Sequence, residues 1–298
     1  MLIKEKLKQT KFSDSQQAVV DYMMQLGPKI KDKTVRQIAR ETYTSSATMI
    51  RIAHKLNYPG WEDLKNAFIE EQEYLSSHFQ EVDANIPFSR SDSPMTIANR
   101  IAVLEKEAIN DTLALINWET IEKAAALIGS RRIVNIVAMN NTIAQAEEFM
   151  YKMGRIQKMV IVQPPSGEGL YNGTITDPTS CMIVISYTGE TGNFIRWIQY
   201  AKEAGIPVIA ITSLGDNSIS RLADLTLRIC TREKMFSKIS WYASEVSISY
   251  LLNVLYSLVF AADYDHHLET KVKRSKKIEQ GRHSSISIIS ESQDPDPF

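Results

Sequence analysis

Residues 182–192 read M-I-V-I-S-Y-T-G-E-T-G, and this stretch decides the fold. The run at 181–185 is short, continuous and rich in Ile and Val, which is typical of a parallel strand covered on both faces. A turn rich in Ser, Thr and Gly follows, and then a helical pattern that stops before Gly205. Ligands of open α/β sheets bind at the carboxyl ends of the strands, so this strand–turn–helix unit predicts a binding site.

The turn has the composition of a phosphate-binding loop. Gly189 allows a positive φ and a close approach of the backbone to a ligand. The free N–H groups of the next helix would face an anion, and Ser186, Thr188 and Thr191 add hydroxyl donors. The turn has no Lys or Arg and no G-K-[ST] ending, which argues against a nucleotide P-loop and favours a smaller phosphate ester. Taken alone, the cluster is also compatible with a plain helix cap.

Strand and helix patterns alternate on both sides of this unit. Strands are expected at residues 133–138, 159–162, 181–186, 208–212 and 225–229, with helices that begin near Thr142, Thr191 and Asn217. Such alternation predicts an α/β domain with a doubly wound parallel sheet. Residues 246–262 are strongly apolar but shorter than the ~20 residues of a membrane span, so we expect a buried helix and no membrane contact.

Composition sets further bounds. The chain has 298 residues, which suggests two domains at ~150 residues each. Its formal net charge of -1 does not indicate a particular class of binding partner. Its N-terminus lacks the apolar core of a signal peptide. Cys181 and Cys230 have no metal-ligand spacing around them, so we expect buried thiols in a reducing cytoplasm, with neither metal nor cofactor.

The N-terminal segment differs from the rest in charge. Residues 1–61 contain 11 Lys and Arg against 5 Asp and Glu, a net charge of +6. Ser13 and Thr34 are typical N-caps for two helices, and a turn at 43–46 leads to a third that ends near Asn57. A short helix, a tight turn and a second helix form the helix-turn-helix plan, in which the second helix enters the major groove of DNA.

The third helix carries suitable side chains for that task. Ser45 and Ser46 stand at its start, where hydroxyl and N–H groups can hold a DNA phosphate. Thr48, Arg51 and Lys55 recur at helical spacing and predict the DNA-contacting face. The apolar face is expected to consist of Met49, Ile50, Ala53 and Leu56. The alternative is the solvated polar face of an ordinary three-helix domain.

Residues 44–61, T-S-S-A-T-M-I-R-I-A-H-K-L-N-Y-P-G-W, resemble the signature of the RpiR/MurR family of bacterial transcriptional regulators. The matching positions are Ser45, Ala47, Thr48, Arg51, Lys55, Leu56, Tyr58, Gly60 and Trp61. Ile52 replaces the usual Phe, and Asn57 replaces the usual Gly. Asn is the best non-glycine residue at a left-handed helix end, so the second change is conservative.

Residues 119–262 resemble the SIS domain, the sugar isomerase module that follows the DNA-binding part in this family. S-Y-T-G-E-T matches its S-x-S-G-x-T phosphate loop, with a Thr at 188 in place of a Ser. After the first strand the family has a Gly-rich loop with a Ser, whereas this chain has two Asn and a Thr; either the ligand sits differently or this half of the site is weakened. A glutamate of the last long helix can accept bonds from sugar hydroxyls or act as a base, although a helix-surface carboxylate is the commoner role. The expected effector-binding residues are Ser186, Thr188, Gly189, Glu190, Thr191, Asn140, Asn141, Thr142 and Glu245.

The resemblance implies a helix-turn-helix domain at 1–75 and a SIS domain at 119–262. Composition and helical periodicity predict a linker and connecting helix at 76–118, and the basic, Ser-rich and acidic end of the chain predicts a mostly disordered tail at 263–298. The resemblance also implies a transcriptional regulator of carbohydrate metabolism that binds double-stranded operator DNA as a homodimer or homotetramer and senses a phosphorylated sugar. Such a protein is not an enzyme and has no catalytic residues. The alternatives are a sugar-phosphate isomerase or related enzyme, and a regulator whose effector site has decayed.

Overall fold

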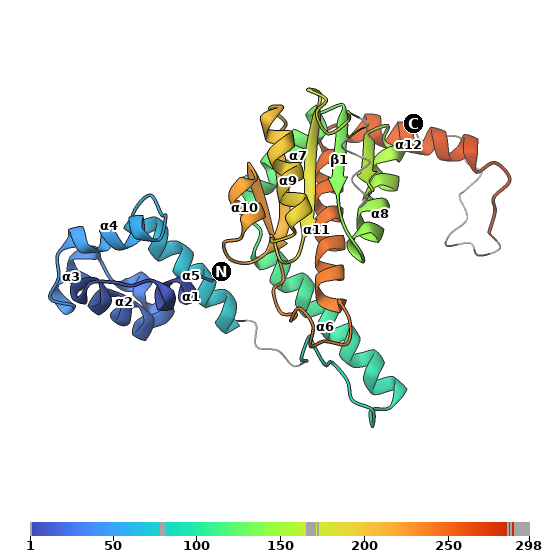
Figure 1. Ribbon diagram of the computed structural model, residues 1–298. Helices are drawn as coiled ribbons and strands as arrows, with labels where there is room; N and C mark the ends of the chain where they lie inside the picture. The colour runs from blue at the N-terminus through green and yellow to red at the C-terminus, as the bar shows by residue number, and fades with distance from the viewer. Residues whose placement is uncertain are drawn as a thin grey trace.

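The computed structural model describes residues 2–77, 82–164, 171, 173–284, 286 and 288. An N-terminal helical domain lies beside a larger α/β domain (Figure 1). Residues 78–81 of the expected linker lie outside the described residues, as do 285, 287 and 289–298 of the expected tail.

The N-terminal domain consists of short helices around one apolar core. They are α1 (Ile3–Gln9), α2 (Asp14–Leu26), the 3-10 helix η1 (Gly27–Asp32), α3 (Val35–Glu41), α4 (Ser46–Lys55) and α5 (Trp61–Ser77). Ser13 and Thr34 are the N-caps of α2 and α3, as predicted. Asn57 has a φ of +65°, which confirms the expected left-handed residue after the third helix.

The second domain contains the predicted parallel sheet. Its elements are α6 (Pro94–Ala114), α7 (Trp118–Ser130), β1 (Ile133–Val137), α8 (Thr142–Arg155), β2 (Met159–Gln163), β3 (Ser180–Ser186), α9 (Gly192–Glu203), β4 (Val208–Ser213), α10 (Ser218–Leu222), β5 (Leu225–Ile229), α11 (Tyr242–Ala261) and α12 (Tyr264–Ile278). The strand order is β2-β1-β3-β4-β5, and every neighbouring pair is parallel. All five expected strands are confirmed to within one residue at each end.

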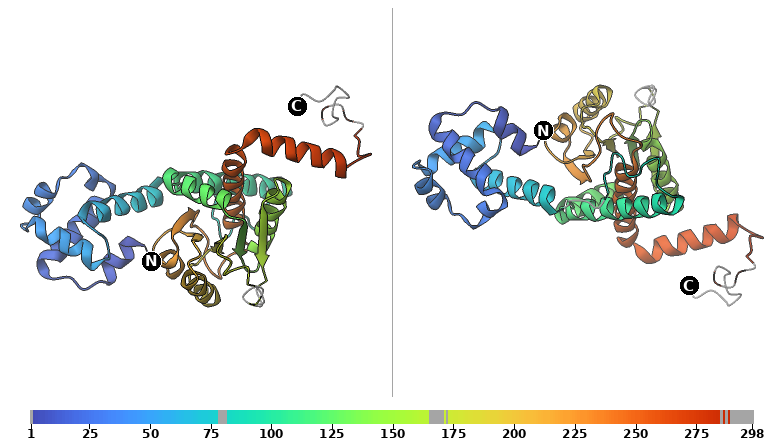
Figure 2. Two further views of the ribbon diagram at one scale, coloured as in Figure 1. Left: turned by 90° about the horizontal axis from the view of Figure 1, so that it is seen from above. Right: turned by 90° about the horizontal axis from the view of Figure 1, so that it is seen from below.

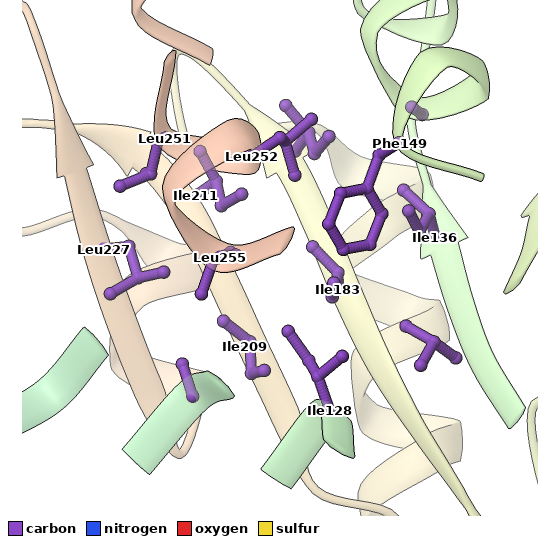
Figure 3. Packing of buried hydrophobic residues seen from close by; sticks show 14 of the residues in the cluster. Ile128, Ile136, Phe149, Ile183, Ile209, Ile211, Leu227, Leu251, Leu252 and Leu255 are labelled. Carbon is purple, nitrogen blue, oxygen red and sulfur yellow. The ribbon is translucent and has the colours of Figure 1, made fainter. Parts of the chain in front are cut away.

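Helices cover both faces of the sheet. On one face, α7, α8 and α11 pack against the strands, and Ile128, Phe149 and Leu252 meet Ile183 in the shared core (Figure 3). On the other face, α9 and α10 supply a second apolar cluster that includes Phe194. Because β3 is the central strand and all of its residues are buried, the turn that follows it is held by a rigid layer on each side.

Helix α11 is the predicted buried helix. Within the described part of the chain it is the one helix long and apolar enough to cross a membrane. It packs instead on α6, α7 and α8, and Ile248, Leu251 and Leu255 are buried there. Its apolar composition is therefore explained by its place in the core.

A buried ion network joins α6 to the segment after β5. Arg232 pairs with Glu107 at 2.5 Å and also with Asp111, which is 1% exposed. The backbone N–H of Cys230 donates to the hydroxyl of Thr112 at 3.2 Å. Both cysteines of the chain are buried, as expected.

The expected disordered tail needs correction. Residues 264–278 form α12, whose first turn contacts the end of α11: His267 Nδ1 lies 2.9 Å from the carbonyl oxygen of Phe260. The ring of Tyr264 packs edge-on against that of Phe260. Helix α12 buries none of its residues, and its polar composition was interpreted as disorder. The Glu, Lys and Arg residues that make it polar are also strong helix formers.

Candidate functional site

The sheet order creates a topological switch point at the carboxyl ends of β1 and β3. β1 lies between β2 and β3, with Val137 level with both Gln163 and Val184. The chain leaves β1 through α8 on one face of the sheet and leaves β3 through α9 on the other. The loops after these two strands therefore diverge from neighbouring points, which is where open α/β sheets bind ligands. Both loops predicted to form the effector site begin at this edge of the sheet.

The turn after β3 is closed by its own hydroxyl groups. Gly189 has a φ of +66°, as predicted, and its N–H donates to the Ser186 hydroxyl oxygen at 3.2 Å. The Ser186 hydroxyl, which is 5% exposed, also bonds to the Thr191 hydroxyl at 3.0 Å. Thr191 is the N-cap of α9 without a side-chain cap bond. Two hydroxyl groups and the start of a 12-residue helix thus converge on one side of the turn.

Thr188 and Glu190 have different surroundings. The Thr188 hydroxyl oxygen accepts the N–H of Glu190 at 3.2 Å and remains partly exposed. The Glu190 carboxylate accepts the N–H of Ser218 at 2.9 Å, and hydrogen bonding from Ser218, foremost from its side chain, lowers the pKa of Glu190. Glu190 is therefore held ionised against the start of α10, so it acts on the shape of the turn. The hydroxyl of Thr188 stays accessible to a ligand.

Asn217 is a residue of this site that sequence analysis missed. Its side chain packs so closely against Gly189 that a Cβ at 189 would lie 2.0 Å from Asn217 Cγ. The Asn217 amide donates to the Thr212 hydroxyl at 3.1 Å, and its carbonyl accepts the N–H of Ser220 at 2.9 Å. The sequence showed Asn217 only as a helix start, because nothing local links residue 217 to residue 189.

Tyr187 and Glu233 form a second unpredicted support. The Tyr187 hydroxyl donates to the carbonyl oxygen of Glu233 at 3.0 Å and accepts the N–H of the same residue at 2.9 Å. The Glu233 carboxylate accepts the N–H of Ala243 at 2.7 Å and the hydroxyl of Ser244 at 2.6 Å, so it caps α11. Burial raises the pKa of Glu233. The turn is thereby tied to the start of α11.

The loop after β1 contains the expected Asn140, Asn141 and Thr142. Asn140 has a φ of +55° and is exposed, so an Asn takes a backbone conformation that usually favours Gly. The Thr142 hydroxyl is buried; it donates to the carbonyl of Met139 at 2.9 Å and accepts its N–H at 3.1 Å. Thr142 therefore shapes the loop, while Asn140 and the partly exposed Asn141 face outward.

Glu245 lies in the first turn of α11 and is partly buried. The ring of Trp241, just before α11, packs edge-on against Tyr187 of the turn at 5.8 Å between centroids. The start of α11 is therefore close to the turn, but contact of Glu245 with a ligand stays a prediction. Among the residues that the structure describes, no three His, Cys, Asp or Glu side chains are grouped to hold a metal ion.

Helices α3 and α4 form the helix-turn-helix. The turn between them is tight: the N–H of Thr44 donates to the carbonyl of Ala39 at 2.8 Å, and Tyr43 has a φ of +52°. Ser45 is the N-cap of α4, and both Ser45 and Ser46 are exposed. The Tyr43 side chain is 97% exposed beside them, an aromatic group at this surface that sequence analysis missed.

The predicted faces of α4 need correction at two positions. Thr48 is 2% exposed, and its hydroxyl lies 3.2 Å from that of Ser45, so its placement on the exposed face is wrong. Ile50 was expected inside but is 47% exposed, whereas Ile52 is fully buried. The cause is helical geometry: positions 49, 52, 53 and 56 share one stripe, and 48 lies one turn before 52.

Arg51 and Lys55 lie on the exposed side, as predicted. Arg51 Nη2 is 3.4 Å from the Thr48 hydroxyl, so the guanidinium folds back along the helix. The Lys55 amine donates to the backbone carbonyl of Lys11 and lies 5.3 Å from the centre of the Phe12 ring. DNA contact by Ser45, Ser46, Arg51 and Lys55 remains a prediction.

The chain thus joins a basic helix-turn-helix domain to a doubly wound domain that has a hydroxyl-rich turn at its switch point. This combination of sites is typical of one class of protein, the DNA-binding regulators with a ligand-sensing domain. Comparison with known families identifies the family of each domain. Residues 126–286 match the SIS domain, and residues 1–74 match the helix-turn-helix domain of the rpiR family. The chain belongs to the SIS-domain family and, within it, to the RpiR-type transcriptional regulators.

Known proteins are similar to this chain over most of its length. An uncharacterized HTH-type transcriptional regulator of Caldanaerobacter subterraneus subsp. tengcongensis is 25% identical over 85% of this chain and 88% of its own length. One from Clostridium perfringens is 25% identical over 93% of this chain and 99% of its own. The Vibrio vulnificus NanR protein complexed with ManNAc-6P superposes with a TM-score of 0.57 and 18% identity, covering 93% of this chain and 98% of that one. At 18% identity, the similarity to NanR shows that the two proteins share a fold and no more than that.

Proposed function

We propose that this chain is a cytoplasmic transcriptional regulator of carbohydrate metabolism whose operator affinity changes when its SIS domain binds a phosphorylated sugar. The observation that carries the proposal is the turn at 187–191. It stands at the switch point of the sheet, with hydroxyl groups and the first turn of α9 around it, in the same chain as a helix-turn-helix. The Vibrio vulnificus NanR protein, which has a similar fold, is complexed with ManNAc-6P, and this supports a sugar phosphate as the ligand class.

The phosphate would bind at the turn after β3. Thr188 and Thr191 would donate hydroxyl bonds, and Ser186 would orient the Thr191 hydroxyl. The positive end of the α9 dipole adds a favourable interaction with the anion. The sugar would then extend toward the loop after β1, where Asn140 and Asn141 offer amide donors and acceptors. Glu245 at the start of α11 is the candidate acceptor for sugar hydroxyls.

The DNA would be bound by α4 in the major groove. Ser45 and Ser46 would hold a phosphate at the helix start, Arg51 would reach a base edge, and Lys55 would contact the backbone. The exposed side chain of Ile50 offers apolar contact to a thymine methyl group. A homodimer or homotetramer would place two such helices on a near-palindromic operator.

A regulator is favoured over an isomerase. The relatives described above are named transcriptional regulators. Glu233, the buried carboxyl group whose backbone contacts the turn, accepts bonds from Ala243 and Ser244 at the start of α11. It is thus a structural cap and a poor candidate for a catalytic base.

The test is a thermal-shift and calorimetric screen of the purified chain against sugar phosphates, with ManNAc-6P in the first set. A ligand at 100 times its dissociation constant should add ~2.7 kcal/mol to the free energy of unfolding. The matching sugar without its phosphate is the control and should give no shift. Product analysis of the same mixtures distinguishes a regulator from an isomerase, because turnover of the sugar phosphate would favour the isomerase. If the chain bound neither the sugar phosphates nor the matching sugars, the proposal of a sugar-phosphate sensor would be contradicted.

A further inference from the structure

The N-terminal domain contacts the SIS domain through an ion pair. Lys6 of α1 lies 2.6 Å from Asp216, which precedes α10, and Arg221 lies 3.1 Å from the same carboxylate oxygen. The Lys6 side chain is 16% exposed and that of Asp216 is 28% exposed. Burial by itself raises the pKa of Asp216, but Lys6 and Arg221 outweigh it and leave that pKa below its ordinary value. This pair is less screened than an ordinary surface pair.

A cavity of about 710 Å³ lies beside the pair, between the two domains. Tyr58, three residues after the end of α4, lines it from one side, and Leu214 and Arg228 line it from the other. The Lys6 amine is 6.0 Å from the centre of the Tyr58 ring, and burial raises the pKa of Tyr58 to about 12. The views in Figures 1 and 2 place the N-terminus beside the α10 side of the sheet. The domains thus meet around a cavity lined by both polar and apolar residues, with the Lys6–Asp216 pair at that contact.

The residues after Asp216 hold the turn of the effector site. The N–H of Ile219 donates to the carbonyl of Gly189 at 3.0 Å, and the N–H of Ser218 donates to the carboxylate of Glu190 at 2.9 Å. Asn217 packs against Gly189 with no space for a methyl group between them. Four consecutive residues, 216–219, therefore contact α1 at one end and the turn along the rest. The turn and Asp216 are thus connected by consecutive residues of one backbone segment.

We propose that segment 216–219 transmits effector binding to the DNA-binding domain, with the Lys6–Asp216 pair as the contact that changes. This inference rests on the proposed function and identifies the route of its regulation. Ligand binding at 187–191 would shift the start of α10 and alter the Lys6–Asp216 contact. Because Tyr58 shares this interface, the orientation of α4 would change with it.

The first test compares operator affinity with and without effector. The variants are Lys6→Ala, Asp216→Ala and the charge reversal Lys6→Asp with Asp216→Lys. The DNA is a duplex that the unaltered protein selects from random sequences, and the effector is ManNAc-6P or the strongest sugar phosphate of the screen. The unaltered chain should show a 5- to 150-fold change in operator affinity on saturation with effector. Both single variants should reduce this change to less than twofold, and the charge reversal should restore more than half of it on a logarithmic scale.

Lys202→Ala is the matched control. Lys202 forms an ion pair of the same length, 2.6 Å, with Asp224 inside the SIS domain, so its removal should leave the effector response unchanged. Calorimetry should show that every variant binds the effector within threefold of the unaltered chain. Single variants that bind effector and keep the full response would overturn the proposal.

A second measurement needs no effector and so separates this inference from the proposed function. Spin labels at Ser15→Cys and Ser130→Cys report the distance between the domains, since both native cysteines are buried. Asp216→Ala should broaden that distance distribution, and Gly189→Ala, which forces Asn217 to move, should shift it. Lys202→Ala should do neither. Identical distributions in all three variants would overturn the proposed route, whatever ligand the turn binds.

Discussion

Asn217 occupies the space that a side chain at Gly189 would need: a Cβ there would lie 2.0 Å from Asn217 Cγ, at a φ of +66°. We therefore expect Gly189→Ala to weaken sugar-phosphate binding at least tenfold and to lower the free energy of unfolding. The left-handed conformation alone costs ~1–2 kcal/mol for a residue with a Cβ, and the contact with Asn217 adds to it. Calorimetric titration and thermal unfolding measure the two effects.

The control for this variant is Gly205→Ala. Gly205 has a φ of +74°, but a Cβ there meets nothing within 4 Å. The Gly205→Ala variant should therefore have a lower free energy of unfolding, from backbone strain, but an unchanged affinity for the ligand. If both variants lose affinity equally, the turn is not the ligand site.

Thr188→Val tests the hydroxyl group of the turn, because it keeps the shape and removes only the donor. Hydrogen bonds to charged groups contribute ~1.5–3 kcal/mol, so binding should weaken roughly tenfold or more. Thr188→Glu should abolish binding by placing a carboxylate against the phosphate. Thr176→Val, which alters a threonine bonded to the carbonyl of Gly173 in the same domain, is the control for calorimetry. Equal ligand affinity in all four proteins would leave the turn as a helix cap only.

Two variants of α4 separate base reading from backbone binding. Arg51→Ala should cost ~1–3 kcal/mol and relax discrimination at one operator position. Lys55→Ala should weaken binding to all DNA sequences alike. It should also reduce the slope of log affinity against log salt concentration by about one unit. Fluorescence titrations against specific and scrambled duplexes at several salt concentrations provide the readout. Arg196→Ala, an exposed arginine of α9, should change nothing; unaltered DNA binding by both α4 variants would contradict the assignment of this helix.

The buried network around Arg232 should matter for folding. Arg232→Ala removes the partner of Glu107 and Asp111 and should destabilise the chain by ~3–5 kcal/mol, because a buried carboxylate is left uncompensated. Arg282→Ala breaks an exposed pair with Glu279 at 2.7 Å and should change stability by less than ~1 kcal/mol. Denaturant unfolding distinguishes them, and similar small losses in both would show that the network contributes little.

The cap of α11 predicts a pH dependence. Burial raises the pKa of Glu233 above its ordinary value of 4.5, so the native state keeps its proton where the unfolded chain has lost it. The contribution of Glu233 to stability is therefore largest below pH 4.5 and declines as pH rises through the native pKa. Glu233→Gln does not titrate, so the stability of the unaltered chain relative to this variant should fall with increasing pH. Parallel pH profiles from thermal unfolding would contradict this.

Sequence patterns predicted the sheet well because each strand is a continuous apolar run that ends in turn residues. The turn at 186–191 was also accessible, since strand, Gly189 and helix start are adjacent in the chain. Asn217 and Glu233 were not, because Asn217 acts through Gly189 and Glu233 through Tyr187, which is 46 positions away in the chain. A contact between two turns that are distant in the chain produces no periodic pattern in the sequence around either turn.

The errors have similar physical causes. Thr48 and Ile50 were misplaced because a ten-residue helix with polar and apolar residues on its flanks fits two orientations almost equally well. The α12 error arose because a charged composition is typical of disorder, whereas this helix combines strong helix propensity with contacts of His267 and Tyr264 with Phe260. In both cases the deciding information lies in the partner surface.

The position of β1 between β2 and β3 has a consequence for how such a sensor can change its ligand. The loops that follow β1 and β3 are neighbours in space, but each is closed by hydrogen bonds within itself or to α10, as at Thr142 with Met139 and Ser186 with Gly189. Substitutions in one loop need not disturb the other. Under the proposed function, recognition of the phosphate and recognition of the sugar would therefore be separable, and a change of effector would need substitutions only at residues 139–142.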